Sequence, residues 1–227
     1  MKCQFLGDSK DSLKWDYLHF LIENLGYDQL KIAWMMTPDD SSGQGKTAHT
    51  DYPARAEILE LCEALRVNRD NSLLTHLPHK CGAKYGVNFH EGDGYFCNSN
   101  REQYFRMLTI GQRELLFLDP DNGFKPDKSF EAAHVGYVDI AGLLERNPSA
   151  LITVFHHFRR IKFQDDFAQI RKRLVDAHAS AICWDGRVMF VNITKCLETI
   201  EKVQELNLDY VTAVLNRPNG IKLTPYS

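Results

Sequence analysis

Two carboxylates, a proline and a carboxamide follow an apolar run in the middle of the chain. Residues 114–118 are mostly apolar, and Asp119, Pro120, Asp121 and Asn122 come directly after them. A short apolar run bounded by turn residues is typical of a strand buried on both faces. Ligands of open α/β sheets bind beyond the carboxyl ends of such strands, and acids are costly to bury there unless something uses them. We therefore predict a catalytic role for residues 119–122; the alternative is a solvated turn.

A second acidic loop follows an earlier predicted strand at residues 31–36. This loop contains Thr37, Asp39, Asp40 and Gly43. Its carboxylates could accept hydrogen bonds from a ribose or an amine, and its glycines would let the backbone approach a ligand closely. The alternative is an ordinary surface loop.

A basic cluster follows a third predicted strand, at residues 150–155. His156 and His157 come first, and Arg159 and Arg160 lie two residues further on. The arginines could hold phosphates, and either histidine could act as a general base or a ligand. The alternative is a basic strand end that faces water. Because the strand runs like its neighbours, we expect its end, Asp39 and Asp119 to share one sheet edge and one cleft.

The first predicted helix begins with charged residues. Asp8 precedes it, and Asp11 and Lys14 lie one turn apart near its start. The helix dipole by itself favours acids at this position, which is the alternative to a role in binding. We expect Asp11 or Ser12 to cap the helix.

Two further motifs do not fit their usual functions. Gly45-Lys46-Thr47 resembles the end of a phosphate loop, but Asp40 stands where that motif needs a glycine. His76, His79 and Cys81 match no standard zinc spacing. We expect neither a phosphate loop nor a bound metal from these residues.

Strands and helices alternate along the chain, and the central strands are continuously apolar. This pattern predicts an α/β fold with three layers: a Rossmann-like, mostly parallel sheet with helices on both faces. Asp185-Gly186 between two apolar runs, 181–184 and 187–193, predicts an antiparallel hairpin near the C-terminus. We expect one domain over residues 1–227, with an insertion or a cap at about 68–97. The other predicted elements are helices at 12–25, 55–65, 99–110, 140–146, 166–177 and 195–206, and strands at 134–138 and 210–215.

Composition limits the class of protein. The chain of 227 residues has 44% hydrophobic residues and a net charge of −3, which favours a folded domain without a strongly basic surface. A nucleic-acid partner would therefore need a local basic patch. No apolar run approaches the roughly 20 residues of a membrane span. The six cysteines lack paired spacing and no signal peptide is apparent, so we expect a cytoplasmic protein with free thiols and no membrane partner. The oligomeric state is open.

The order of these motifs resembles a known family. The charged helix start at 8–14, the acidic loop at 37–40 and Phe117-Leu118-Asp119-Pro120 occur in this order. This order resembles Rossmann-like methyltransferases that use S-adenosylmethionine. In layout it is most similar to large-subunit rRNA adenine methyltransferases and three-Cys-motif partner proteins. It also resembles a group of uncharacterised bacterial proteins that carry a Phe-Leu-Asp-Pro-Asp-Asn-Gly segment.

The resemblance implies roles for the candidate residues. Asp119 and Pro120 match the start of the Asp/Asn-Pro-Pro-aromatic stretch that grips the target amine in amino-methyltransferases. Asp121 and Asn122 depart from that stretch, and Phe124 would supply a stacking face. The remaining roles are cofactor contacts from Asp8, Lys14, Thr37, Asp39, Asp40 and Gly43, and substrate contacts from His156, His157, Arg159 and Arg160.

Three functions remain open from the sequence. The first is an S-adenosylmethionine-dependent methyltransferase that acts on a nucleobase amine of a nucleic acid. The second is a nuclease or phosphohydrolase in which Asp8, Asp39, Asp119 and Asp121 converge on Mg²⁺. The third is a catalytically inert Rossmann-like module that binds a nucleotide or a partner protein. Whether the protein is an enzyme is therefore a hypothesis at this point.

Overall fold

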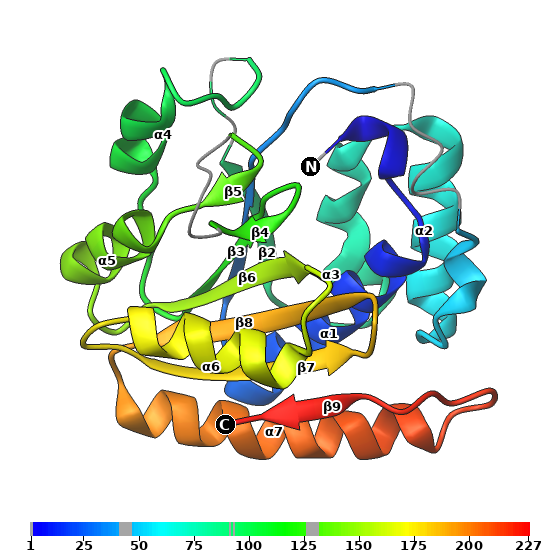
Figure 1. Cartoon of the computed structure of the whole chain (residues 1–227). Helices are drawn as coiled ribbons and strands as arrows, with labels where there is room; N and C mark the ends of the chain where they lie inside the picture. The colour runs from blue at the N-terminus through cyan, green and yellow to red at the C-terminus, as the bar shows by residue number, and fades with distance from the viewer. Residues whose placement is uncertain (1, 41–46, 91, 93, 126–131) are drawn as a thin grey trace.

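The computed structural model describes residues 2–40, 47–90, 92, 94–125 and 132–227 (Figure 1). Its centre is a seven-stranded sheet with the strand order β2-β1-β3-β6-β8-β7-β9. These strands are β1 (Gln29–Trp34), β2 (Gly86–His90), β3 (Glu114–Asp119), β6 (Leu151–His157), β7 (His178–Trp184), β8 (Val188–Thr194) and β9 (Thr224–Tyr226). Two short strands, β4 (Gly123–Phe124) and β5 (His134–Val135), pair in parallel beside it.

Five of the seven strands run in the same direction. β2, β1, β3 and β6 are parallel neighbours, β8 is antiparallel to β6, and β7 is antiparallel to β8. β9 is antiparallel to β7 at the sheet edge. The predicted mostly parallel α/β sheet with a late antiparallel hairpin is confirmed. The hairpin turns at Asp185 and Gly186, where Gly186 has a φ of +71°, a conformation that glycine adopts without strain.

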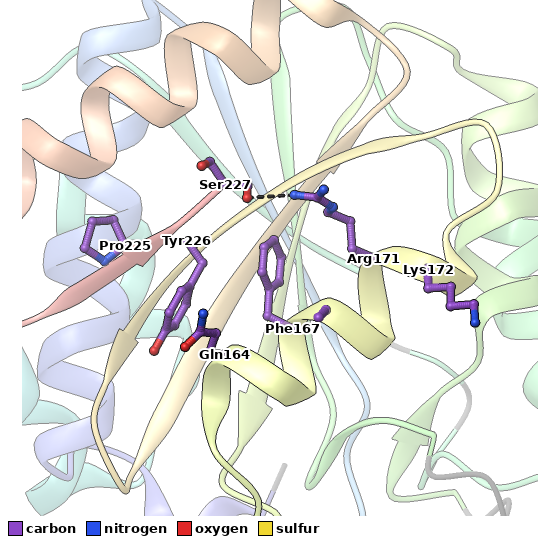
Figure 2. A pocket seen from close by; sticks show the side chains of 8 residues that line it. Gln164, Phe167, Arg171, Lys172, Pro225, Tyr226 and Ser227 are labelled. Atoms are coloured by element: carbon purple, nitrogen blue, oxygen red, sulfur yellow. Dashed lines mark hydrogen bonds between the residues drawn. The ribbon is translucent and has the colours of Figure 1, made fainter.

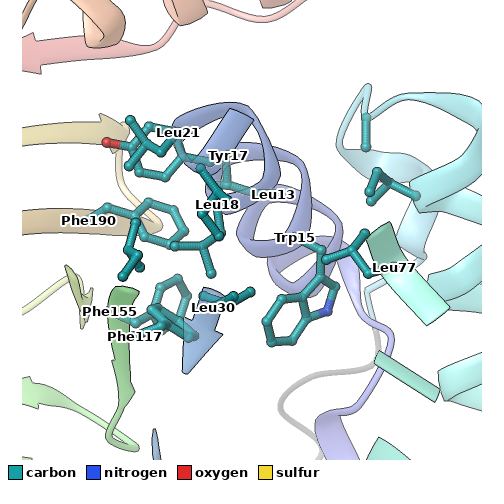
Figure 3. Packing of buried hydrophobic residues seen from close by; sticks show 14 of the residues in the cluster. Leu13, Trp15, Tyr17, Leu18, Leu21, Leu30, Leu77, Phe117, Phe155 and Phe190 are labelled. Carbon is teal, nitrogen blue, oxygen red and sulfur yellow. The ribbon is translucent and has the colours of Figure 1, made fainter. Parts of the chain in front are cut away.

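Helices cover both faces of the sheet and form two separate apolar cores. On one face lie α1 (Ser9–Leu25), α2 (Ala56–Asn68) and α7 (Leu197–Leu215). Figure 3 shows this core, in which Leu13, Tyr17 and Leu18 of α1 pack toward aromatic side chains of the sheet. On the other face lie α4 (Arg101–Met107), α5 (Tyr137–Arg146) and α6 (Phe163–Arg173). The shorter helical segments are η1 (Cys3–Phe5), η2 (His49–Asp51), η3 (Asn71–His76) and α3 (Leu77–Lys80).

The start of α1 differs from the sequence prediction. The cap is Asp8, not Asp11 or Ser12, and its carboxylate accepts hydrogen bonds from the backbone amides of Lys10 and Asp11. The helix therefore begins three residues earlier, at Ser9, and Gly26 ends it in the left-handed conformation. This earlier start places Lys10, Asp11 and Lys14 on adjacent turns of one helix.

The C-terminal elements also differ. The predicted strand at 210–215 is wrong, because α7 continues without interruption to Leu215 and buries Val203, Tyr210 and Val214 along one side. The helix predicted at 166–177 is also displaced: α6 begins at Phe163, after Lys162, which provides no side-chain cap, and it ends at Arg173. Within the segment 68–97, where we predicted an insertion or a cap, Gly86–His90 forms β2, which pairs in parallel with β1 and is an edge strand of the sheet. In the described part of the chain, no helix is both long and apolar enough to cross a membrane.

Candidate functional site

A cavity of about 200 Å³ lies beyond the carboxyl ends of β3 and β6. The loop after β3, the end of β6 and the first turns of α1 all contribute to it. Its lining residues are Lys2, Phe5, Asp8, Lys10, Asp11, Lys14, Asp119, Pro120, Asp121, Asn122, Ala133, Phe155 and His157. All four residues that we predicted after the central strand therefore line one cavity, together with the charged start of α1. Parallel neighbouring strands end at the same edge, which explains this convergence.

Lys14 joins two of the acids in this cavity. Its Nζ lies 2.9 Å from Oδ2 of Asp119 and 3.0 Å from Oδ1 of Asp11, and 4.3 Å from the ring centroid of Phe155. Burial lowers the pKa of Lys14, but the charges of Asp11 and Asp119 outweigh that effect and raise it. Lys14 therefore remains protonated at neutral pH.

Asp119 is buried at the C-terminal end of β3. Burial raises the pKa of its carboxyl group, and the neighbouring ammonium of Lys14 opposes that rise. An ion pair of this kind lets a carboxylate remain in a region poor in water. The pair thus holds one oxygen of Asp119 in place at the cavity wall.

Asp8 is a second buried carboxyl group at the cavity. Its Oδ1 accepts both capping hydrogen bonds of α1, while no described residue donates a hydrogen bond to Oδ2. Burial, together with the charge of Asp11, raises the pKa of Asp8 to about 6. A cationic or hydrogen-bonding ligand would relieve the cost of this charge.

The acidic loop after β1 lies beside the cavity, and part of it contacts the N-terminal segment. Thr37 donates a hydrogen bond to Oδ2 of Asp121, which links the loops after β1 and β3. Asp39 accepts a hydrogen bond from the backbone amide of Gln4, at 3.2 Å, and Asp40 pairs with Lys2 at 2.5 Å. Asp39 and Asp40 do not line the cavity. Gly43 and Lys46, also considered from the sequence, lie outside the described residues.

Three residues that we predicted to bind substrate instead hold the fold together. Phe124 is fully buried and stacks on Tyr137, with 5.3 Å between the ring centroids. The backbone amide of Phe124 donates to Nδ1 of His156, and Nε2 of His156 lies 2.9 Å from Asp166. Arg159 pairs with the same aspartate. Phe124 therefore presents no exposed ring face in this structure, and His156 and Arg159 are paired with Asp166.

Gly123 explains why this loop can approach β6 so closely. Its φ is +92°, and a Cβ atom there would lie 2.2 Å from Nδ1 of His156. Only glycine fits this contact. The Asn-Gly dipeptide that follows Asp121 therefore has a packing function in addition to any chemical one.

His157 and Arg160 have different surroundings from their neighbours. His157 lines the cavity, and its Nδ1 lies 3.4 Å from Nζ of Lys10. Burial and the charge of Lys10 hold the pKa of His157 well below its usual value, so its ring is neutral. Arg160 is exposed and has a φ of +65°. Of the predicted basic cluster, only His157 reaches the cavity wall.

Sequence reasoning missed Lys10 and Phe155 as residues of this site, and considered Asp11 only as part of the helix start. A signal was present for the charged pair, because Lys10 and Lys14 are four residues apart and therefore share one face of a helix. Phe155 could not be distinguished from any other apolar residue of its strand.

The described residues include no group of three histidine, cysteine, aspartate or glutamate side chains placed to hold a metal ion. Asp8 and Asp119, two of the acids proposed for Mg²⁺, lie at the cavity, but Asp119 is paired with Lys14. All six cysteines are free thiols.

A larger groove, of about 590 Å³, lies between α6 and β9 (Figure 2). Phe167 and Tyr226 stack within it, with 6.0 Å between their ring centroids, and Arg171 donates a hydrogen bond to the backbone oxygen of Ser227. None of the predicted site residues lines this groove. The cavity beside Asp119, although smaller, is therefore the one that the predicted site residues line.

Comparison with known proteins gives a structural relationship. No family model matches the chain, and no curated protein matches it. Among solved structures, it is similar to the crystal structure of protein LPL1258 from Legionella pneumophila str. Philadelphia 1, described under the family model DUF519. The two share 12% identity with a TM-score of 0.52, and the similarity covers 97% of each chain. At this identity the similarity supports a common fold over nearly the whole chain and carries no function with it.

Proposed function

We propose that the protein is a methyltransferase that uses S-adenosylmethionine to modify a nucleobase amine in a nucleic acid. The observation that carries this proposal is the position of Asp119-Pro120. This dipeptide follows the central strand β3, lines the cavity, and has its carboxylate held by a protonated lysine. Its sequence matches the start of the amine-binding stretch of the family that the chain resembles.

The carboxylates that line the cavity suit the charges and hydroxyl groups of the proposed cofactor. S-adenosylmethionine carries a sulfonium, an ammonium and two ribose hydroxyls. A carboxylate attracts the two cationic groups and can accept hydrogen bonds from the ammonium and the hydroxyls. Asp8 offers Oδ2, to which no described residue donates a hydrogen bond, and burial together with the charge of Asp11 raises its pKa to about 6. Ligand sites usually measure about 300–1,000 Å³, so a cavity of about 200 Å³ encloses only part of such a ligand. The rest would extend past Thr37 and the loop after β1.

The residues of the cavity would act by holding and orienting the substrate. Asp119 accepts a hydrogen bond from the target amine, which directs the nitrogen lone pair away from the carboxylate. Lys14 favours the ionised form of Asp119 and fixes the position of its carboxylate, because it pairs with both Asp119 and Asp11. Phe155 and Pro120 line the cavity beside these charges, which limits the access of water. When bound, S-adenosylmethionine supplies the methyl group.

One observation favours a second candidate, an inert module that binds a nucleotide. Asp119 already has Lys14 as a partner, and Asp39 and Asp40 are already engaged by Gln4 and Lys2. In such a module the charged residues of the cavity would bind a ligand without transferring a group.

Ligand-dependent thermal stability separates these functions. We expect adenosylhomocysteine at 1 mM to raise the melting temperature, and MgCl₂ or MnCl₂ to leave it unchanged. A methyl-transfer assay with labelled S-adenosylmethionine and unmodified RNA and DNA then tests catalysis. Stabilisation by adenosylhomocysteine without transfer favours the inert module. Stabilisation by the metal ions alone supports the nuclease and refutes the methyltransferase.

We also propose a cytoplasmic location. The six cysteines support it, because a reducing compartment keeps such thiols free. Cell fractionation with an epitope-tagged chain tests this location, and recovery from the secreted fraction would contradict it.

A further inference from the structure

Lys10 is the one lysine of α1 that faces the cavity without an acidic partner. Among described residues, its ammonium contacts only the ring of His157, at 3.4 Å. Lys14, one turn further along the helix, pairs with two carboxylates. Burial lowers the pKa of Lys10, and the negative charges of Asp8 and Asp11 offset that effect only in part. An anionic ligand would add a further negative charge beside this ammonium group.

The ring of His157 adds a second hydrogen-bond donor. An ammonium group can only donate, so Nδ1 of His157 must be the acceptor in this contact. The proton of the neutral ring then lies on Nε2, which becomes a donor. Lys10 and His157 together therefore offer ammonium and imidazole protons at one wall of the cavity.

A third basic residue lies near this wall. Arg187 is in the turn between β7 and β8, with its guanidinium 4.2 Å from the ring centroid of Trp184. It is close enough for its positive charge to lower the pKa of Lys10. The charges of Asp8 and Asp11 act on Lys10 in the opposite direction, and they act on Lys14 as well. Of the two lysines of α1 at the cavity, Lys14 is held in ion pairs with Asp11 and Asp119, whereas Lys10 forms no ion pair with a described residue.

We propose that Lys10 and His157 bind the phosphate of the nucleotide whose base amine reaches Asp119. This inference rests on the proposed function, and it specifies the substrate as a nucleotide recognised through its phosphate as well as its base. Lysine binds phosphate as a point charge, and hydrogen bonds between charged groups are about twice as strong as neutral ones. Such a nucleotide would present its base amine to Asp119 and its phosphate to Lys10 and His157, all of which line the same cavity.

Binding of mononucleotides and nucleosides tests this inference on the full chain. Affinities for AMP, adenosine, CMP and cytidine are measured by calorimetry in low salt. For at least one base, the nucleotide should bind at least tenfold more tightly than its nucleoside. Lys10→Gln should remove that preference while leaving the nucleoside affinity within twofold, and Lys10→Arg should restore most of it. Lys172→Gln, the same change at an exposed lysine of α6, is the matched control and should have no effect.

Several results would overturn the inference. The inference fails if the wild type binds nucleotide and nucleoside with equal affinity, or if it shows no detectable binding of AMP or CMP up to 10 mM. It also fails if Lys10→Gln keeps the preference for the nucleotide. If Lys10→Gln does not fold, His157→Gln is measured instead and should reduce the preference at least threefold. Adenosylhomocysteine affinity is followed in parallel. A loss of adenosylhomocysteine affinity in Lys10→Gln would show that Lys10 and His157 bind the cofactor carboxylate, and it would refute the phosphate site. Phosphate preference without any adenosylhomocysteine binding would instead refute the proposed methyltransferase and leave the phosphate site standing.

Discussion

Replacing Asp8 with asparagine should stabilise the protein at neutral pH and weaken its ligand binding. Asparagine caps helices about as well as aspartate, so the two hydrogen bonds to the first turn of α1 are retained. The substitution removes only the negative charge. In the folded protein, the pKa of Asp8 is raised to about 6 from its usual value of 3.8, because the side chain is buried and lies near Asp11.

The sign of the pH dependence follows from this pKa. The folded state keeps the proton of Asp8 to a higher pH than the unfolded state, so stability falls as the pH rises from about 4 to about 6. The gap between 3.8 and about 6 corresponds to at most about 3 kcal/mol. Because part of that cost is shared with Asp11, we expect Asp8→Asn to stabilise the fold by about 1–2 kcal/mol at pH 7.5. At pH 4 the variant should match the wild type within about 0.5 kcal/mol.

Urea denaturation at pH 4, 5, 6 and 7.5, followed by tryptophan fluorescence, measures the free energy of unfolding. Asp70→Asn is the matched control, since Asp70 also caps a helical segment but is exposed. Hydrogen bonds from Ser72 lower the pKa of Asp70, so its contribution is lost as the pH falls, the opposite direction. Adenosylhomocysteine affinity should drop more than tenfold in Asp8→Asn. A stability difference that does not change between pH 4 and 7.5, or a loss of stability at pH 7.5, would refute this account of the cavity.

Three further predictions concern other charged residues. Lys14→Met should cost about 3–5 kcal/mol at pH 7 by denaturation, because it leaves buried carboxylates uncompensated. The cost should shrink as the pH falls, because burial raises the pKa of Asp119 and favours its neutral form; a loss below about 1 kcal/mol at pH 7 would contradict the ion pair. Asp119→Asn should abolish methyl transfer in the labelled assay, while the affinity for adenosylhomocysteine stays within threefold and the free energy of unfolding falls by about 1–3 kcal/mol. Retained methyl transfer would show that Asp119 has no part in the reaction. Arg159→Ala should lower the free energy of unfolding by about 1–3 kcal/mol, because its buried partner Asp166 loses an ion pair. Arg160 is exposed, so Arg160→Ala should change the same quantity by less than about 0.5 kcal/mol. Equal effects of the two substitutions would contradict the different surroundings of the two arginines.

Local sequence patterns were sufficient for the sheet and for the polar residues that follow its strands. The apolar runs before Asp119 and His156 each form a buried strand, and the Asp-Gly dipeptide forms the late hairpin. These features depend on residues close together in the chain, so the sequence alone contains them. The same reasoning failed where local preference and tertiary packing disagree. Residues 210–215 include aromatic and β-branched side chains that favour a strand, yet they extend α7, because Tyr210 and Val214 continue its buried side.

Only the tertiary structure decided which of the charged residues meet. His156 and His157 are neighbours with the same side chain, but successive residues of a strand point to opposite faces, so one binds Asp166 and the other reaches the cavity. Lys14 and Asp119 are 105 positions apart, and their ion pair exists because α1 packs beside the ends of β3 and β6. The sequence determined that charged groups would gather at strand ends. The packing of distant elements determined which of them are paired with each other and which, like Lys10 and Asp8, form no ion pair with a described residue.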